Sequence, residues 1–309
     1  EMQRSLVGSE MCIRDRSKPP VHEYFTIIME IVRTIARLRE AVADARSKGL
    51  SVGLVPTMGA LHKGHMSLIE RARRECDVVV VSDFVNPTQF NNPDDLRTYP
   101  RTEEADCQKM ETAGVDYAFI PSVEEIYPEP DTRVFDLGPV AEVMEGAMRP
   151  GHFNGVAQIV SKLFDIVTPD KAYFGEKDFQ QIAVIRRMVE LIGRGPEIVA
   201  CPILRENDGL AMSSRNVRLS AEQRAIAPGI HRVLVDAVAY ATNHTAAETE
   251  RFVTETINAI DGLETEYFKI VDALTMQPVD PQMRPDASTV GCVTVYCGDV
   301  RLIDNIRFK

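Results

Sequence analysis

Two histidines three residues apart, His62 and His65, lie where a predicted strand leads into a predicted helix. The apolar run 52–55 is typical of a buried strand, and Gly59 and Gly64 allow a tight loop before the helix that begins at His65. A helix N-terminus carries unpaired N–H groups and a positive partial charge, so a phosphate binds well there. Each imidazole can donate a hydrogen bond to a phosphate oxygen and can be charged near neutral pH. This stretch therefore predicts a phosphate-binding loop.

The histidine pair has other interpretations. A His-x-x-His pair can hold zinc, although no further His or Cys cluster in the sequence completes a tetrahedral set. A glycine-containing turn between a strand and a helix also occurs for geometry alone, and this loop matches neither the P-loop pattern nor the dinucleotide fingerprint. His-Lys-Gly-His at such a junction resembles the ATP-binding signature of the nucleotidyltransferase superfamily, which class I aminoacyl-tRNA synthetases share. That resemblance implies adenylate formation with release of pyrophosphate.

A second polar phrase, FVNPTQF at 84–90, follows the next predicted strand. Asn86 and Gln89 are candidate substrate-binding residues, because a side-chain amide both donates and accepts and can fix a hydroxyl or a carboxylate. The alternative is that both amides only cap the loop.

A third phrase, GEKDFQQ at 175–181, follows a strand and opens a helix. Lys177 is a point charge suited to phosphate, and Gln181 lies one turn further along, where an amide can contact a substrate. Asp178 can cap the helix, pair with Lys177, or bind ribose or magnesium. A salt-bridged helix start is the alternative.

The fourth phrase, MSSR at 212–215, places two hydroxyls and a guanidinium side by side. These groups suit a triphosphate, because arginine offers paired donors, and the phrase resembles the mobile Met-Ser-Lys loop of class I synthetases. In an open parallel sheet, ligands bind at the carboxyl ends of the strands. We therefore expect all four phrases to meet at one edge of a sheet.

The hydrophobic pattern predicts alternating strands and helices. We expect helices at 26–48, 102–113, 154–167 and 178–192, with strands at 52–55 (ended by Pro56 and Thr57), 77–85, 116–121, 171–174 and 197–203. This order is typical of an α/β fold with a parallel, Rossmann-type sheet. Beyond residue 204 we expect helices at 221–243 and 246–260 and strands at 265–272, 289–297 and 300–306. The last two strands meet at Gly298-Asp299, which predicts an antiparallel hairpin.

The chain has 309 residues, enough for two domains, which we place at 23–204 and 205–309. Residues 1–22 show neither hydrophobic periodicity nor a secretory signal, and we expect a disordered or non-native tail. The net charge of −11 argues against broad binding to nucleic acid or to a membrane surface. No apolar run reaches the ~18 residues of a membrane span. The six cysteines are scattered, which favours free thiols in a reducing cytoplasm.

Together the four phrases and RPGHFNGV at 149–156 closely resemble the pantoate–β-alanine ligase (pantothenate synthetase) family over residues 24–309. The resemblance implies a Rossmann-like domain with a smaller C-terminal α+β lid domain, in a cytoplasmic homodimer. It also implies two chemical steps. Pantoate and ATP, with Mg²⁺, give pantoyl adenylate and pyrophosphate, and β-alanine then attacks the acyl carbon to give pantothenate and AMP.

The same resemblance implies roles for individual residues. His65 would donate to the ATP phosphates with His62 beside it, and Lys177 and Arg215 would complete the catalytic set. Gln89 would bind pantoate and lie close to β-alanine, and Gln181 would also hold pantoate. The ATP-binding positions would be Met58, Gly59, Ala60, Leu61, His62, Lys63, Gly64, His65, Gly175, Glu176, Lys177, Asp178, Leu204, Met212, Ser213, Ser214 and Arg215.

Two positions depart from the family pattern. Asp83 stands in a predicted central strand where Ile or Leu is usual, and it must find a partner or lie at a wet strand end. Thr88 replaces the usual Met or Leu and adds a hydroxyl near the pantoate pocket. Two other functions stay open. One is another adenylyl- or cytidylyltransferase, which Gln89 and Gln181 disfavour because they suit a small hydroxy acid. The other is a nucleotide sensor without turnover.

Overall fold

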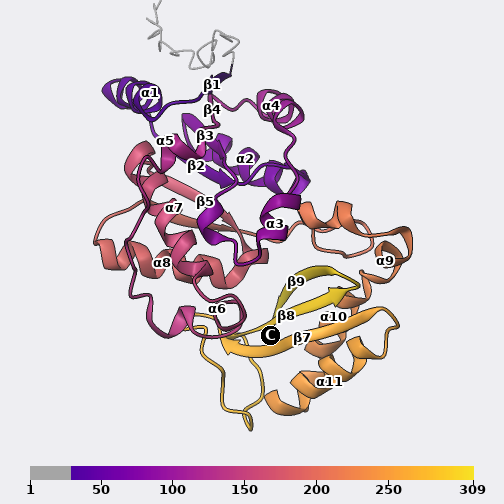
Figure 1. The fold of residues 1–309 in the computed structure, drawn as a ribbon. Coiled ribbons are helices and arrows are strands. Elements are labelled where there is room, and N and C mark those ends of the chain that lie inside the picture. The colour runs from indigo at the N-terminus through magenta and orange to yellow at the C-terminus, as the bar shows by residue number, and fades with distance from the viewer. Residues whose placement is uncertain (1–28) are drawn as a thin grey trace, which may run out of the picture.

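The structure, a computed structural model, describes residues 29–309. Two sheets organise these residues, and Figure 1 shows them one above the other. A six-stranded parallel sheet belongs to the N-terminal part, and a three-stranded antiparallel sheet belongs to the C-terminal part. The tail predicted at 1–22 lies outside the described residues.

The parallel sheet has the strand order β1-β4-β3-β2-β5-β6, which confirms the Rossmann-like α/β class. Its strands are β1 (Glu30–Val32), β2 (Val52–Thr57), β3 (Val78–Asp83), β4 (Tyr117–Phe119), β5 (Lys171–Gly175) and β6 (Glu197–Cys201). The chain proceeds outward from β2 through β3 to β4, and then returns to β5 on the other side of β2. Because the strand order reverses between β2 and β5, the loops that follow these two strands open a crevice there.

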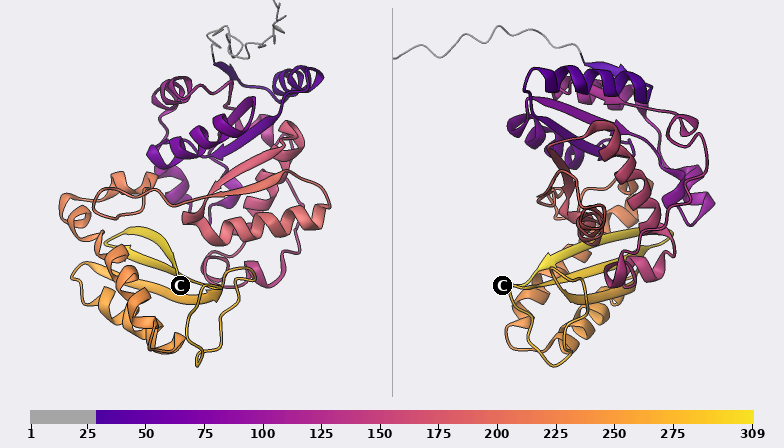
Figure 2. Two further views of the ribbon diagram at one scale, coloured as in Figure 1. Left: turned by 180° about the vertical axis from the view of Figure 1, so that it is seen from behind. Right: turned by 90° about the vertical axis from the view of Figure 1, so that its left-hand side faces the viewer.

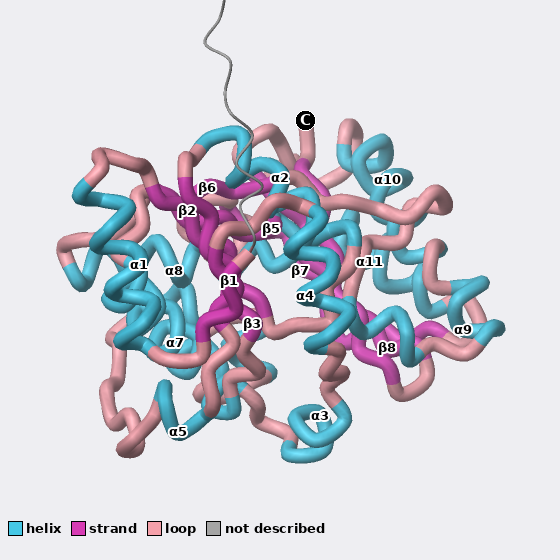
Figure 3. The backbone as a smooth tube through the Cα atoms, turned by 90° about the horizontal axis from the view of Figure 1, so that it is seen from above, coloured by secondary structure: helices cyan, strands magenta, loops and turns pink. Residues whose placement is uncertain are grey.

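Helices cover both faces of this sheet, as Figure 3 shows from above. On one face α1, α7 and α8 pack over a core that includes Leu38, Leu163 and Ile185, and on the other α2 and α4 pack over Ile69 and Met110. The helices are α1 (Ile35–Ser47), α2 (Lys63–Glu75), α3 (Pro93–Thr98), α4 (Glu103–Thr112), α5 (Val123–Ile126), α6 (Glu145–Met148), α7 (His152–Val167) and α8 (Phe179–Ile192). Short 3₁₀ turns are η1 (Pro87–Gln89), η2 (Gly138–Ala141) and η3 (Glu176–Asp178).

The C-terminal part consists of the antiparallel sheet and a layer of helices that covers one of its faces. It comprises the 3₁₀ turn η4 (Ser214–Arg218), α9 (Ala221–Ile226), α10 (Gly229–Ala241), α11 (Ala246–Asn258), β7 (Leu263–Asp272), β8 (Thr289–Cys297) and β9 (Val300–Arg307). Val293, Val295 and Cys297 face α10 and α11, so the alternate side chains of β8 face the N-terminal part. Figure 2 shows this sheet between the two helices and the N-terminal part. The predicted hairpin is confirmed, because Cys297 pairs with Val300.

Three element predictions are wrong. The helix predicted over 26–48 is the edge strand β1 followed by α1, which begins only after its cap Thr34. The helix predicted over 221–243 is broken at Pro228 into α9 and α10, because proline has no N–H and clashes with the preceding turn. Strand β2 also continues through Pro56 to Thr57.

Pro56 is tolerated because of where β2 is paired. The Val52 carbonyl accepts a hydrogen bond from Asp170, next to β5. Because alternate residues of a strand present their backbone groups to the same side, Leu54 and Pro56 also face β5. Strand β5 pairs with β2 only at Gly53 and Leu54, so the proline lies beyond the ladder and no bond is lost. Across residues 29–309, none of the helices combines the length and the apolar character that a bilayer crossing requires.

Candidate active site

The four polar phrases meet at one cavity above the carboxyl ends of the parallel strands. Its lining includes Met58, His62, Gly64, His65, Asn86, Gln89, Gly175, Lys177, Asp178, Gln181, Leu204, Met212, Ser213, Ser214 and Arg215. Of the positions predicted to bind ATP, Gly59, Ala60, Leu61, Lys63 and Glu176 lie outside this lining. The sequence therefore predicted correctly that His65, Lys177 and Arg215 share a cavity.

The loop after β2 is held from behind by a buried carboxylate. Asp106 in α4 accepts hydrogen bonds from the backbone N–H groups of Ala60 and Leu61, each at 2.8 Å. Its side chain is fully buried, and Lys109 binds the Leu61 carbonyl at 2.6 Å. Gly59 has φ of +78°, and a Cβ there would lie 2.4 Å from Asp83 Oδ1, so only glycine fits this turn. Helix α4 thus fixes the shape of the loop.

The two histidines form a reciprocal cap at the start of α2. His62 is the N-cap residue, and its Nδ1 accepts from the Gly64 N–H at 3.1 Å. His65 Nδ1 accepts from the His62 N–H at 3.3 Å, and the ring centroids lie 4.1 Å apart. Because each Nδ1 accepts, the proton of each neutral ring is on Nε2. The helix therefore begins with His62 as its cap, one turn before the predicted start at His65, and presents two Nε2–H donors.

The expectation that these imidazoles carry charge near neutral pH is wrong. Burial, with the nearby Lys177 ammonium, lowers the pKa of His62 to about 4. Burial and the neighbouring His62 lower the pKa of His65 to about 3. Both rings are therefore neutral at pH 7, and they can serve a phosphate as hydrogen-bond donors but not as cations.

Gln89 lies on η1, directly against helix α7. The side-chain oxygen of Gln89 accepts from Asn86 Nδ2 at 3.1 Å, and Asn86 also donates to the Gly155 carbonyl at 3.2 Å. A Cβ at Gly155 would lie 2.4 Å from the Thr88 carbonyl oxygen, so glycine is required for this close approach. The Asn86 amide therefore orients Gln89 and ties the turn to helix α7, but it does not cap the turn.

The Gly175–Asp178 phrase is held in place by the C-terminal part. Asn305 on β9 donates from Nδ2 to the backbone carbonyls of Glu176 at 2.8 Å and Lys177 at 3.0 Å. The Lys177 ammonium lies 3.7 Å from an Asp178 oxygen, too far for a hydrogen bond. Lys177 therefore faces the cavity with its charge loosely compensated.

The Met212–Ser213–Ser214–Arg215 phrase is docked onto the segment around α3. Ser214 Oγ lies 3.1 Å from the Tyr99 hydroxyl, and Arg215 donates to Asp95 at 3.0 Å. Arg218 binds the other Asp95 oxygen at 3.3 Å. Asp95 therefore neutralises the arginine that the sequence predicts for the triphosphate, and that arginine must share or exchange this partner to bind a phosphate.

The two departures from the family pattern have different surroundings. Asp83 makes no ion pair within residues 29–309 and lies half-buried at the end of β3, so the partner that the sequence analysis left open is absent there. Burial and the nearby carboxylates of Asp106 and Glu103 raise the pKa of Asp83 to about 6. The Thr88 hydroxyl binds Asn86 Oδ1 at 3.2 Å and does not line the cavity.

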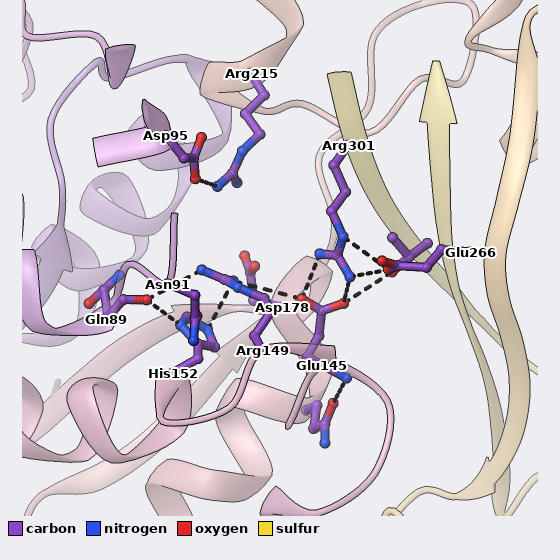
Figure 4. Close-up of polar contacts among 12 residues, drawn as sticks. Gln89, Asn91, Asp95, Glu145, Arg149, His152, Asp178, Arg215, Glu266 and Arg301 are labelled. Atoms are coloured by element: carbon purple, nitrogen blue, oxygen red, sulfur yellow. Dashed lines mark hydrogen bonds and ion pairs between the residues drawn. The ribbon is translucent and has the colours of Figure 1, made fainter. Parts of the chain in front are cut away.

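A second cavity of about 510 Å³ lies between the two parts of the molecule. It shares Lys177, Asp178, Gln181 and Arg215 with the first cavity. On its wall Glu145 receives both Nη groups of Arg301 at 2.8 and 2.7 Å, as Figure 4 shows. Although burial acts in the opposite direction, this guanidinium helps to lower the pKa of Glu145 to about 2.

Several polar residues of the site escaped the sequence-based prediction. They are Asp95, Tyr99, Asp106, Glu145, Arg149 and His152. The phrase RPGHF contained two of them, but its spacing did not indicate a role. Within residues 29–309, no three His, Cys, Asp or Glu side chains are arranged to hold a metal ion, so no third side chain there joins the histidine pair as a zinc ligand. Five cysteines in this range are free thiols, as predicted.

The chain is similar to known proteins of one family. A family model described as pantoate-beta-alanine ligase matches residues 30–307. A pantothenate synthetase from Porphyromonas gingivalis is 62% identical over 281 residues, which are 91% of this chain and 100% of the relative. One from Phocaeicola vulgatus is 59% identical over 282 residues, with the same coverage.

Solved structures agree. The chain is similar to pantothenate synthetase from Thermus thermophilus with a TM-score of 0.84 and 45% identity, over 91% of this chain and 100% of that one. It is also similar to the Francisella tularensis pantoate-beta-alanine ligase complexed with beta-gamma ATP and beta-alanine, with a TM-score of 0.76 and 36% identity over 90% and 97% of the two chains. The chain therefore belongs to the pantoate-beta-alanine ligase family.

Proposed function

We propose that this protein is a pantothenate synthetase, which uses ATP to condense pantoate with β-alanine and releases AMP and pyrophosphate. Family membership supports this reaction. The observation that assigns roles to named residues is that phosphate donors and two glutamines, Gln89 and Gln181, line one cavity. ATP as a substrate is further supported by the ATP-complexed Francisella relative.

In the first step the pantoate carboxylate attacks the α-phosphorus of ATP, and pyrophosphate leaves. The attacking carboxylate is already an anion, so no strong base is needed, and the barrier comes from charge repulsion and charge that develops on phosphate. The Nε2–H groups of His62 and His65, the Lys177 ammonium and the Arg215 guanidinium stabilise this charge. Gln89 and Gln181 hold the acid in line with the phosphorus.

In the second step the free amine of β-alanine attacks the acyl carbon. A C–N bond forms, the bond from the acyl carbon to the phosphate oxygen breaks, and AMP leaves with that electron pair. The amine nitrogen loses one proton to water. We assign the approach of the amine to the open side of the cavity at Gln181, because this residue also lines the second cavity.

Mg²⁺ is expected to accompany the ATP. The ion prefers oxygen ligands and usually binds one or two carboxylates together with substrate phosphates, and the Asp178 carboxylate lines the cavity beside Lys177. Asp178 is therefore the residue that would hold it, and the ion would neutralise part of the triphosphate charge.

Three coarser features complete the proposal. The division into domains at 23–204 and 205–309 is supported by the two separate sheets and cores. A homodimer and a cytoplasmic location rest on the family resemblance and, for the location, on the free thiols. Sedimentation equilibrium at twice the chain mass would support the dimer, and a monomer at every concentration would contradict it.

The deciding experiment is a coupled assay of AMP release with ATP, pantoate and β-alanine. We expect AMP only when all three are present, and pantoate-dependent exchange of pyrophosphate into ATP without β-alanine. AMP release that ignores pantoate would instead favour another nucleotidyltransferase. ATP binding with no pyrophosphate release under any condition would favour a nucleotide sensor.

A further inference from the structure

Arg149 differs from the other arginines on the second cavity in how its charge is compensated. Each of the others has a carboxylate oxygen within 3.3 Å of its guanidinium. These arginines are Arg97, Arg215, Arg218 and Arg301. The nearest carboxylate to Arg149 within residues 29–309 is Glu145, at 3.7 Å, which is too far for a hydrogen bond. Figure 4 shows the Arg149 guanidinium between Glu145 and the pair formed by Gln89 and His152.

Two of the three neighbours of Arg149, the Glu145 carboxylate and the Gln89 carbonyl, are held by better partners. Arg301 binds Glu145 through two hydrogen bonds, and Tyr267 donates to it at 2.8 Å. The Gln89 carbonyl accepts from His152 Nδ1 at 2.8 Å, whereas Arg149 reaches it only at 3.4 Å. The remaining contact of Arg149 is to the neutral His152 Nε2, at 3.1 Å. The guanidinium therefore makes one hydrogen bond of ordinary length, to His152, and no close ion pair within residues 29–309.

A largely buried cation without a close anion costs free energy. Burial, with the nearby Arg215 and Arg301, lowers the pKa of the Arg149 guanidinium. Only a fifth of its side chain is exposed, and that part faces the second cavity. Such a group, with N–H donors still available, is suited to bind an anionic ligand that enters the cavity.

The position of Arg149 restricts which anion this is. The phosphate donors His62, His65, Ser213 and Ser214 line the first cavity, and Arg149 does not. Arg149 instead lies behind the backbone of Gln89, whose side chain faces the acid substrate, and it shares the second cavity with Gln181. Lys177 and Arg215 line both cavities, so the ligand of Arg149 lies next to the acyl group and outside the wall that His62, His65, Ser213 and Ser214 form.

We propose that Arg149 binds the carboxylate of the amine substrate, a short ω-amino acid, while the amino group reaches the acyl carbon between Gln89 and Gln181. This assignment rests on the proposed function, in which that substrate is β-alanine. Most carboxylates on the cavity wall are neutralised by arginines and do not repel it strongly. Glu145 and Glu266 are bound by Arg301, Asp94 by Arg97, Asp95 by Arg215 and Arg218, and Asp304 by Arg205.

The test separates the two half-reactions in the full-length enzyme. For Arg149→Gln we expect kcat/KM for β-alanine to fall about 10²-fold, while pantoate-dependent exchange of pyrophosphate into ATP, which needs no amine, stays within about threefold of wild type. The preference of the wild type for β-alanine over uncharged β-alaninamide should disappear in the variant, and Arg149→Lys should recover part of it. Arg39→Gln, which removes an exposed arginine that lines neither cavity, is the matched control and should change neither activity.

A second measurement uses the wild type and does not depend on how a variant folds. Propionate should compete with β-alanine and not with pantoate, and propylamine should not inhibit. Equal losses with β-alanine and β-alaninamide, or loss of exchange together with an unchanged KM for β-alanine, would overturn the proposal and make Arg149 a positioning residue for Gln89. Absence of pantoate-dependent exchange in the wild type would instead refute the proposed function itself.

Discussion

Replacing Asp83 with asparagine should stabilise the protein above pH 6 and change its stability much less near pH 4. The carboxyl lies half-buried at the end of β3, near the carboxylates of Asp106 and Glu103 and against Gly59 of the histidine loop. A carboxyl whose pKa is higher in the folded chain holds its proton more tightly there, so its ionisation favours unfolding. This cost is absent below the unfolded pKa, grows as pH rises, and is complete above the folded pKa.

The magnitude follows from the shift. The pKa of Asp83 is raised from 3.8 to about 6, and each unit corresponds to about 1.4 kcal/mol, so the upper limit is about 3 kcal/mol. Solvent screens part of this interaction because the side chain is not fully buried, so we expect a gain of about 1–3 kcal/mol at pH 8.

The assay is urea unfolding of the wild type and of Asp83→Asn between pH 4 and pH 8. The difference in the free energy of unfolding between the two proteins is taken at each pH, so that the contributions of other titrating groups cancel. Any constant effect of the new amide dominates this difference near pH 4. Asp261→Asn, at an exposed position, removes the same charge and serves as the control. A difference between wild type and Asp83→Asn that does not vary with pH would refute the reasoning.

Three further perturbations concern the candidate site. His65→Ala should slow pantoate-dependent pyrophosphate exchange by about 10²–10³-fold while the folded structure survives, and an unchanged rate would contradict the assigned donor. Asp106→Ala should lower the free energy of unfolding by about 1–3 kcal/mol for each stranded N–H of Ala60 and Leu61, measured by urea unfolding, and a loss below about 1 kcal/mol would argue against this support of the loop. ATP should slow proteolysis of the 205–216 loop if the C-terminal part closes over the nucleotide, and identical digestion with and without ATP would count against closure.

The sequence predicted the parallel sheet because most of its strands are apolar runs between amphipathic helices. It missed β1, a strand of only three residues, because Ile31 and Ile35 also fit a helical stripe. It also missed the break at Pro228, although proline inside a helical pattern is a known stop signal. In both places a local pattern was compatible with two structures, and contacts with distant residues decided between them.

The sequence predicted the residues that lie in the loops around the cavity. It did not predict the helix residues that hold those loops in place. Nothing in the acidic stretch around Asp106 distinguishes the one carboxylate that turns inward from those that face solvent. The histidine pair was recognised from its spacing, but its charge was not, because the pKa of an imidazole depends on a burial that only the folded chain creates.

The contact of Gly155 with the Thr88 carbonyl has a consequence for redesign of the enzyme. There the turn that carries Gln89 rests on helix α7 backbone to backbone, so no substitution at that contact can enlarge or shrink the cavity beside Gln89 without displacing the glutamine. The adjustable wall is the stretch of α7 directly after this glycine, where Val156, Ile159 and Val160 line the same cavity. Attempts to make the enzyme accept bulkier or smaller hydroxy acids should therefore vary these three aliphatic side chains and keep the glycine.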